Sequence, residues 1–139
     1  MPALDTSVIV AFYIPEAISG RVQRLFSSGT PLAINSLVEV EFASAVARRV
    51  RMRSISHDDG RRVLEEFALH VQENLYAFNP VTQEAFTLAG EWLGSLRTSL
   101  RTLDALQLAV AHVNDLSFMT ADKALAKAAR ELGVAMEAL

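Results

Sequence analysis

Short apolar runs alternate along this chain with longer segments of helical periodicity. Apolar runs bounded by turn residues are typical of strands buried in a parallel sheet. These predicted strands cover residues 2–4, 31–35, 76–78, 116–120 and 134–136. The periodic segments predict helices over residues 9–13, 19–28, 36–52, 56–74, 81–96, 103–113 and 122–132. The alternation predicts an α/β protein, a three-layer α/β/α sandwich with helices on both faces of a central parallel sheet.

Helix-end signals and side-chain stripes refine these boundaries. Ser36 is the expected N-cap of the third helix, and Ser56 with Asp59 resembles a capping box at the start of the fourth. Gly133 is expected to end the last helix. The helix over 103–113 has an apolar stripe formed by four residues at helical spacing: Leu103, Leu106, Val110 and Val113.

Length and composition narrow the class of protein. The 139 residues suit one domain, 1–139, and 51% of them are hydrophobic, enough for a full core. The absence of cysteine excludes disulfides and thiolate metal sites. The longest apolar run, Val8 to Ile14, is far shorter than a membrane span. No Lys or Arg precedes Arg21, so the basic region that opens a signal peptide is missing. We therefore expect a cytoplasmic protein with no membrane association.

Charge is distributed unevenly around a net value of −3. Residues 48–62 hold six arginines and two aspartates, whereas residues 63–96 hold five glutamates and no Lys or Arg. The net charge argues against a protein that coats nucleic acid by bulk charge. The basic segment is either a solvated helix face or a place where phosphates bind, and the sequence alone leaves both open.

The candidate chemistry rests on carboxylates. The chain has no dinucleotide-binding or P-loop glycine motif, no nucleophile-elbow serine, and no metal-ligand spacing among its three histidines. The acids in apolar surroundings are Asp5, Glu39, Glu41, Asp104 and Asp122. Each has an ordinary structural alternative: Asp5 and Asp122 as helix N-caps, Asp104 as a charge near a helix start, and the glutamates as solvated surface.

Taken together, these acids predict a metal site. Asp5 and Asp122 each follow a predicted strand, and ligand sites of parallel sheets lie beyond the carboxyl ends of the strands. Acids in apolar surroundings are costly unless they are paired or bound to a cation. Hard oxygen ligands without histidine or cysteine suit Mg²⁺ or Mn²⁺.

Four segments resemble the acidic motifs of the PIN-domain family. They are Leu4-Asp-Thr-Ser7, Ser36-x-x-x-x-Glu41 followed by Ala45, Leu100-Arg-Thr-Leu-Asp-Ala-Leu-Gln-Leu-Ala109, and Thr120-Ala-Asp-Lys-Ala-Leu125. Their order and their coverage, about residues 3–136, are similar to those of the compact VapC-type ribonuclease toxins of toxin–antitoxin pairs.

The resemblance assigns roles to individual residues. It implies that Asp5, Glu41, Asp104 and Asp122 form the catalytic quartet. Asp5 and Asp104 are then the most direct metal ligands. Glu41 and Asp122 ligate the metal or orient its bound waters. Thr6 and Thr120 match positions that support the acids.

Two positions qualify this assignment. Periodicity alone does not choose between Glu39 and Glu41, since Glu39 shares a predicted stripe with Phe42, Ala43 and Val46, and only the resemblance selects Glu41. Gln107 departs from the family, in which many relatives have histidine, and no catalytic role is assigned to it.

The resemblance further implies a Mg²⁺- or Mn²⁺-dependent endoribonuclease that acts as the toxin of a type II toxin–antitoxin pair. A metal-activated water hydrolyses an RNA phosphodiester to a 5′-phosphate and a 3′-hydroxyl. The implied partners are a cognate antitoxin protein, the RNA substrate and a second copy in a homodimer. Six arginines are candidates for RNA phosphate contacts: Arg48, Arg49, Arg51, Arg53, Arg97 and Arg101.

Two other readings stay open at the level of sequence. One is a PIN-like RNA-binding or assembly module whose acids no longer catalyse. The other is a Mg²⁺ phosphohydrolase of the same architecture that acts on DNA or small phosphoesters.

Overall fold

The computed structural model describes all 139 residues. Its strands are β1 (Pro2–Leu4), β2 (Ala33–Asn35), β3 (Ala77–Asn79) and β4 (Ser117–Met119). Its helices are α1 (Thr6–Tyr13), α2 (Ser19–Ser27), α3 (Ser36–Arg51), α4 (His57–Gln72), α5 (Gln83–Gly94), α6 (Thr102–Val113) and α7 (Lys123–Glu131). Every element lies in or beside a segment that the periodicity predicted.

The four strands form one parallel sheet in the order β3-β2-β1-β4. The fifth predicted strand, residues 134–136, is wrong, because this segment makes only an isolated bridge between Phe118 and Met136. The Phe118 N–H donates to the Ala135 carbonyl and the Phe118 carbonyl accepts from the Glu137 N–H. The segment pairs with β4 at Phe118 alone, so it does not form a strand.

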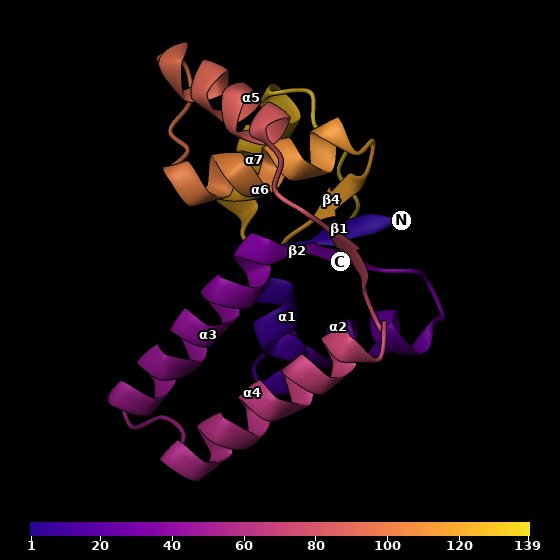
Figure 1. Ribbon diagram of the computed structural model, residues 1–139, viewed down its shortest axis with the longest axis vertical. Helices are drawn as coiled ribbons and strands as arrows, with labels where there is room; N and C mark the ends of the chain where they lie inside the picture. Colours follow the sequence, from indigo (N-terminus) through magenta and orange to yellow (C-terminus); the bar gives the residue numbers. More distant parts are fainter.

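Helices cover both faces of the sheet, which confirms the predicted α/β/α sandwich. In Figure 1 α1 to α4 lie on one side of the strands and α5 to α7 on the other. Side chains alternate accordingly: Leu4 and Ile34 join the core beneath α1 to α4, whereas Ala3, Ala33 and Phe118 join the core beneath α6 and α7. No helix of the structure is long and apolar enough to cross a membrane.

The start of α3 differs from the prediction by one residue. Asn35, the last residue of β2, is the N-cap, and its side-chain oxygen accepts from the N–H groups of Leu37 and Val38. Ser36 is already the first helical residue. Asparagine is as good an N-cap as serine, and here it leaves the strand in the extended conformation that a cap requires. The cap predicted at Ser56 is confirmed, since its hydroxyl accepts from Asp59 N–H.

Two predicted stripes are also corrected. On α3 the fully buried residues are Val38, Phe42 and Val46, whereas Glu39 and Ala43 are exposed. The stripe therefore follows a spacing of four residues and excludes Glu39. On α6 the predicted apolar stripe wrongly includes its first residue, because Leu103 is 47% exposed.

The strand order creates a switch point between β1 and β4. The chain moves from β1 outward through β2 to β3 and then returns to the other side of β1 for β4. Neighbouring strands whose connections leave in opposite directions open a crevice at their carboxyl ends, where ligands of such sheets bind. Asp5 follows β1 directly and Thr120 follows β4 directly.

Candidate active site

Asp5 lies at this switch point and does not cap a helix with its side chain. Its N–H donates to the Met119 carbonyl at 2.9 Å, which ties it to the end of β4. Its carboxylate makes no capping bond to α1. Instead Oδ2 accepts from the Ser7 hydroxyl at 2.6 Å and from the Thr120 hydroxyl at 2.8 Å. Asp5 is only 8% exposed, so its carboxylate is nearly buried. One of its two oxygens is held by two hydroxyl donors.

Glu41 is held in the same way from α3. Its Oε1 accepts from the Thr6 hydroxyl at 3.3 Å and from Gln107 Nε2 at 2.6 Å. Glu39 is exposed on another side of the helix and makes no such bond. The structure therefore places Glu41 beside the switch point, where periodicity alone left the choice open.

Gln107 is a site residue that sequence reasoning left without a role. It is 1% exposed on α6, and its Oε1 accepts from Asn35 Nδ2 at 2.8 Å. The orientation of both amides follows from the cap of α3: Asn35 Oδ1 takes two backbone N–H groups, so its Nδ2 must donate to Gln107. Gln107 Nε2 is then free to donate to Glu41. The available signal was a single amide in the apolar run of α6.

Asp104 and Asp122 complete the set in different ways. Asp104 is half-buried in the first turn of α6, and its carboxylate has no hydrogen-bond donor in the protein. Asp122 is exposed and caps α7, with Oδ1 accepting from the N–H groups of Ala124 and Leu125. The structural role considered for Asp122 is thus present, whereas the same role is absent for Asp5.

The acids interact electrostatically. Burial raises the pKa of Glu41; the Gln107 hydrogen bond lowers that pKa, and the Asp5 charge raises it again. Burial likewise raises the pKa of Asp104, and the charges of Asp5 and Asp122 raise it further, while Arg101 lowers it. Like charges close together disfavour one another's ionised form, so a cation bound beside these carboxylates would be favoured.

The donor set suits a hard divalent cation held by few carboxylates. No three acidic or histidine side chains lie close enough to hold one ion together. Asp5 and Glu41 each keep one carboxylate oxygen without a protein donor, and no unpaired polar side-chain atom is fully buried, so these oxygens reach solvent. Mg²⁺ is typically bound by one or two carboxylates, with water and substrate phosphate as its other ligands. A pair of carboxylates, Asp5 with its free oxygen and Asp104, fits that pattern.

The candidate arginines do not lie together. Arg48 and Arg49 line a groove that also contains Thr6 and Ser7, next to the acids. Arg51 lines a separate groove between α3 and α4. Three others lie in exposed turns and loops outside the helices: Arg53, Arg97 and Arg101. Only Arg101 among these three acts on the pKa of a candidate acid, that of Asp104.

Comparison with known proteins identifies the class. The family model "PIN domain" matches residues 3–131, and the chain belongs to the PIN-domain family. The resemblance noted in the sequence is thereby confirmed. Among named relatives, the chain is similar to Ribonuclease VapC3 of Pyrobaculum aerophilum, with 26% identity over 125 residues, which cover 89% of this chain and 91% of the relative.

Solved structures share the fold. Mycobacterium tuberculosis VapC20, described as a sarcin–ricin loop cleaving toxin, superposes with a TM-score of 0.73 at 20% identity, covering 92% of this chain and 95% of VapC20. A toxin–antitoxin complex from Klebsiella pneumoniae gives a TM-score of 0.65 at 12% identity, with 88% and 87% of the two chains covered. At these identities the likeness establishes the architecture alone.

Proposed function

We propose that this protein is a Mg²⁺-dependent endoribonuclease and the toxin of a toxin–antitoxin pair. The observation that carries the proposal is the group of interacting carboxylates at the switch point, in which Asp5 and Glu41 each have one oxygen fixed and one oxygen free. The names of the relatives agree with it, since VapC3 is a ribonuclease and VapC20 cleaves the sarcin–ricin loop.

In this proposal the reaction is hydrolysis of an RNA phosphodiester by water. A bound Mg²⁺ supplies charge that offsets the phosphate and lowers the pKa of water. Asp5 and Asp104 are the proposed metal ligands, with Asp122 at the edge of the site. Ser7 and Thr120 fix the Asp5 carboxylate, so its free Oδ1 is oriented before substrate binds.

Glu41 is the proposed proton acceptor. Thr6 and Gln107 hold Oε1, which leaves Oε2 to accept a proton from the attacking water. The new bond joins the water oxygen to phosphorus, the bond to the 3′ oxygen breaks, and the leaving oxygen takes a proton from solvent. The products are a 5′-phosphate and a 3′-hydroxyl, and no protein nucleophile is needed.

The proposed partners are an antitoxin protein and a second copy of this chain. The Klebsiella relative was solved as a toxin–antitoxin complex, which supports the first partner. Exposed apolar side chains such as Val40, at 70%, and Leu96, at 89%, are compatible with the second. Light scattering of the purified chain measures the oligomeric state, and a monomer at micromolar concentration contradicts the homodimer.

Induced expression in cells tests the toxin role. Wild type is expected to arrest growth and cut RNA, and co-expression of the protein encoded by the neighbouring gene is expected to restore growth. Asp5→Asn is the matched control, because it nearly keeps the shape of the side chain and removes the charge. Arrest that is equally strong with Asp5→Asn would point to a binding module that does not catalyse.

A further inference from the structure

A groove of about 680 Å³ borders the candidate acids. Thr6 and Ser7 line it, and these residues donate to Glu41 and Asp5 respectively. The groove continues along α1 and α3 as far as Ser54, in the turn that follows α3. A ligand lying in it therefore reaches from the turn after α3 to the residues that hold the carboxylates.

The groove wall carries two arginines from successive positions of α3. Arg48 is exposed and has no ion-pair partner, since the structure contains only the ion pairs Arg49–Glu16 and Arg62–Asp59. Arg49 Nη2 contacts Glu16 Oε2 at 3.0 Å, and both side chains are 32% exposed. Glu16 is the one acid among the residues that line the groove.

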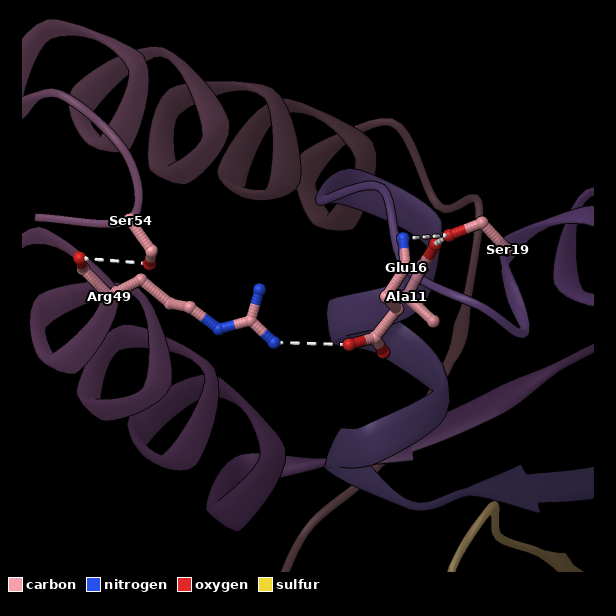
Figure 2. A network of polar contacts seen from close by, with 5 residues as sticks. All are labelled: Ala11, Glu16, Ser19, Arg49 and Ser54. Atoms are coloured by element: carbon pink, nitrogen blue, oxygen red, sulfur yellow. Dashed lines mark hydrogen bonds and ion pairs between the residues drawn. The ribbon is translucent and has the colours of Figure 1, made fainter. Parts of the chain in front are cut away.

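Figure 2 shows that the Arg49–Glu16 pair joins α3 to the turn after α1. The backbone at both residues is hydrogen-bonded: Ser54 Oγ donates to the Arg49 carbonyl at 3.1 Å, and the Glu16 N–H donates to Ser19 Oγ at 2.8 Å. Ser19 in turn donates to the Ala11 carbonyl. The Glu16 carboxylate thus occupies the position on Arg49 where an anionic ligand would otherwise bind.

The remaining lining suits a sugar–phosphate backbone. Hydroxyls of Ser44 and Ser54 stand beside the apolar side chains of Val10, Ala45 and Met52. A second groove of similar size, by contrast, carries the acids Glu84, Glu91 and Asp115, which repel a polyanion, and it borders α5 and α6. The groove along α1 and α3 combines the unpaired charge of Arg48 with Thr6 and Ser7, the residues that donate to Glu41 and Asp5.

We propose that this groove holds the RNA strand beside the bond that is cleaved, with Arg48 bound to one backbone phosphate and a second phosphate replacing Glu16 on Arg49. The choice of RNA rests on the proposed function. An ion pair that is about one-third exposed contributes little stability, so a phosphate can replace the carboxylate at small cost. Arginine binds phosphate through two parallel N–H donors, which favours the exchange.

The first test measures binding of a short fluorescent single-stranded RNA as a function of salt, without Mg²⁺, so that binding is separated from cleavage. Arg48→Gln is expected to bind roughly tenfold more weakly, with the salt slope reduced by about 0.7 for one lost phosphate contact. Arg51→Gln is the matched control, because it removes the same charge from the same helix in the groove toward α4. Weaker binding by Arg51→Gln with no change in Arg48→Gln would overturn the proposal.

The second test addresses the exchange at Arg49. Glu16→Gln is expected to bind RNA about threefold more tightly, because no ion pair has to be broken first. In an Arg49→Gln background the same change at Glu16 is expected to have no effect. A gain that persists without Arg49 would mean that Glu16 acts only by its charge, and the exchange would be refuted.

Cleavage assays on the same variants separate this inference from the proposed function. RNA cleavage by wild type that Arg48→Gln leaves unchanged would overturn the groove and keep the ribonuclease. Binding that depends on Arg48 in a protein that cuts no RNA would keep the groove and overturn the ribonuclease. Absence of RNA binding by wild type would overturn the groove as well.

Discussion

Replacing Gln107 with leucine tests how the site is built into the core. Gln107 and Asn35 are 1% and 3% exposed, so the substitution leaves the Asn35 Nδ2 donor buried without an acceptor. An unsatisfied buried donor costs about 1–3 kcal/mol. Loss of the bond to Glu41 adds less, because Glu41 is half-buried and keeps the Thr6 donor. After an offset for the more apolar side chain, we expect a loss of about 2 kcal/mol.

Thermal and urea unfolding measure this loss directly. For a chain of this length about 2 kcal/mol corresponds to a melting temperature lower by roughly 5–8 °C. Gln107→His is the matched control: a neutral imidazole has one acceptor nitrogen for Asn35 and one N–H donor for Glu41, so most of the stability should return.

RNA cleavage by the same variants reports on Glu41. The Gln107 hydrogen bond lowers the pKa of Glu41, so its removal should raise that pKa and leave Oε1 less firmly held. We expect the leucine variant to cleave more slowly and the histidine variant to retain activity. A leucine variant as stable and as active as wild type would refute the reasoning about this hydrogen-bond chain.

Three further predictions concern Asp104 and Glu41 in the site and Tyr13 in the core. Asp104→Asn removes a half-buried charge that neighbouring carboxylates repel, so its melting temperature in EDTA should be higher than that of wild type, by a few degrees for about 1 kcal/mol. Differential scanning fluorimetry should also show a smaller gain from Mg²⁺ than in wild type, and a lower melting temperature in EDTA would make Asp104 a structural residue. Glu41→Gln should lower RNA turnover by at least about tenfold while Glu39→Gln retains most of it, and the reverse would move the second motif by two residues. Burial raises the pKa of Tyr13, which is hydrogen-bonded to Tyr76, so the unfolding free energy should fall as pH rises above about 10 and fall less steeply in Tyr13→Phe; equal slopes in alkaline urea titrations would contradict this.

The architecture was predictable because its signals are local. Each observed strand overlaps a predicted apolar run, with β3 ending one residue beyond its run, and each helix follows a periodic segment with its own cap or breaker. Residues 134–136 show where local pattern fails. An apolar tripeptide after a helix C-cap has the pattern of a strand, whether or not it pairs with the sheet along its length. Local pattern likewise allowed Ser36 as a cap, although Asn35 takes that place.

The support of the site was less predictable, because it depends on contacts distant in sequence. Gln107 joins partners 72 and 66 residues away, and no local pattern distinguishes such an amide from one that merely tolerates burial. The arginine-rich segment shows the same limit. Arg48 and Arg51 are only three residues apart on α3, yet they line different grooves. The acids were found from their apolar surroundings, and the resemblance selected Glu41 and the supporting Thr6 and Thr120, whereas the donors Ser7 and Gln107 required the fold.

Cleavage of a defined RNA by the purified protein tests the central claim most directly. The reaction is run in Mg²⁺, in Ca²⁺ and in EDTA, with Asp5→Asn purified in parallel to exclude contaminating nuclease. The account predicts 5′-phosphate products in Mg²⁺, little turnover in Ca²⁺ because its looser geometry positions water poorly, and none in EDTA or with Asp5→Asn. Full activity in EDTA, or an Asp5→Asn variant as active as wild type, would contradict a metal-dependent site built on these carboxylates.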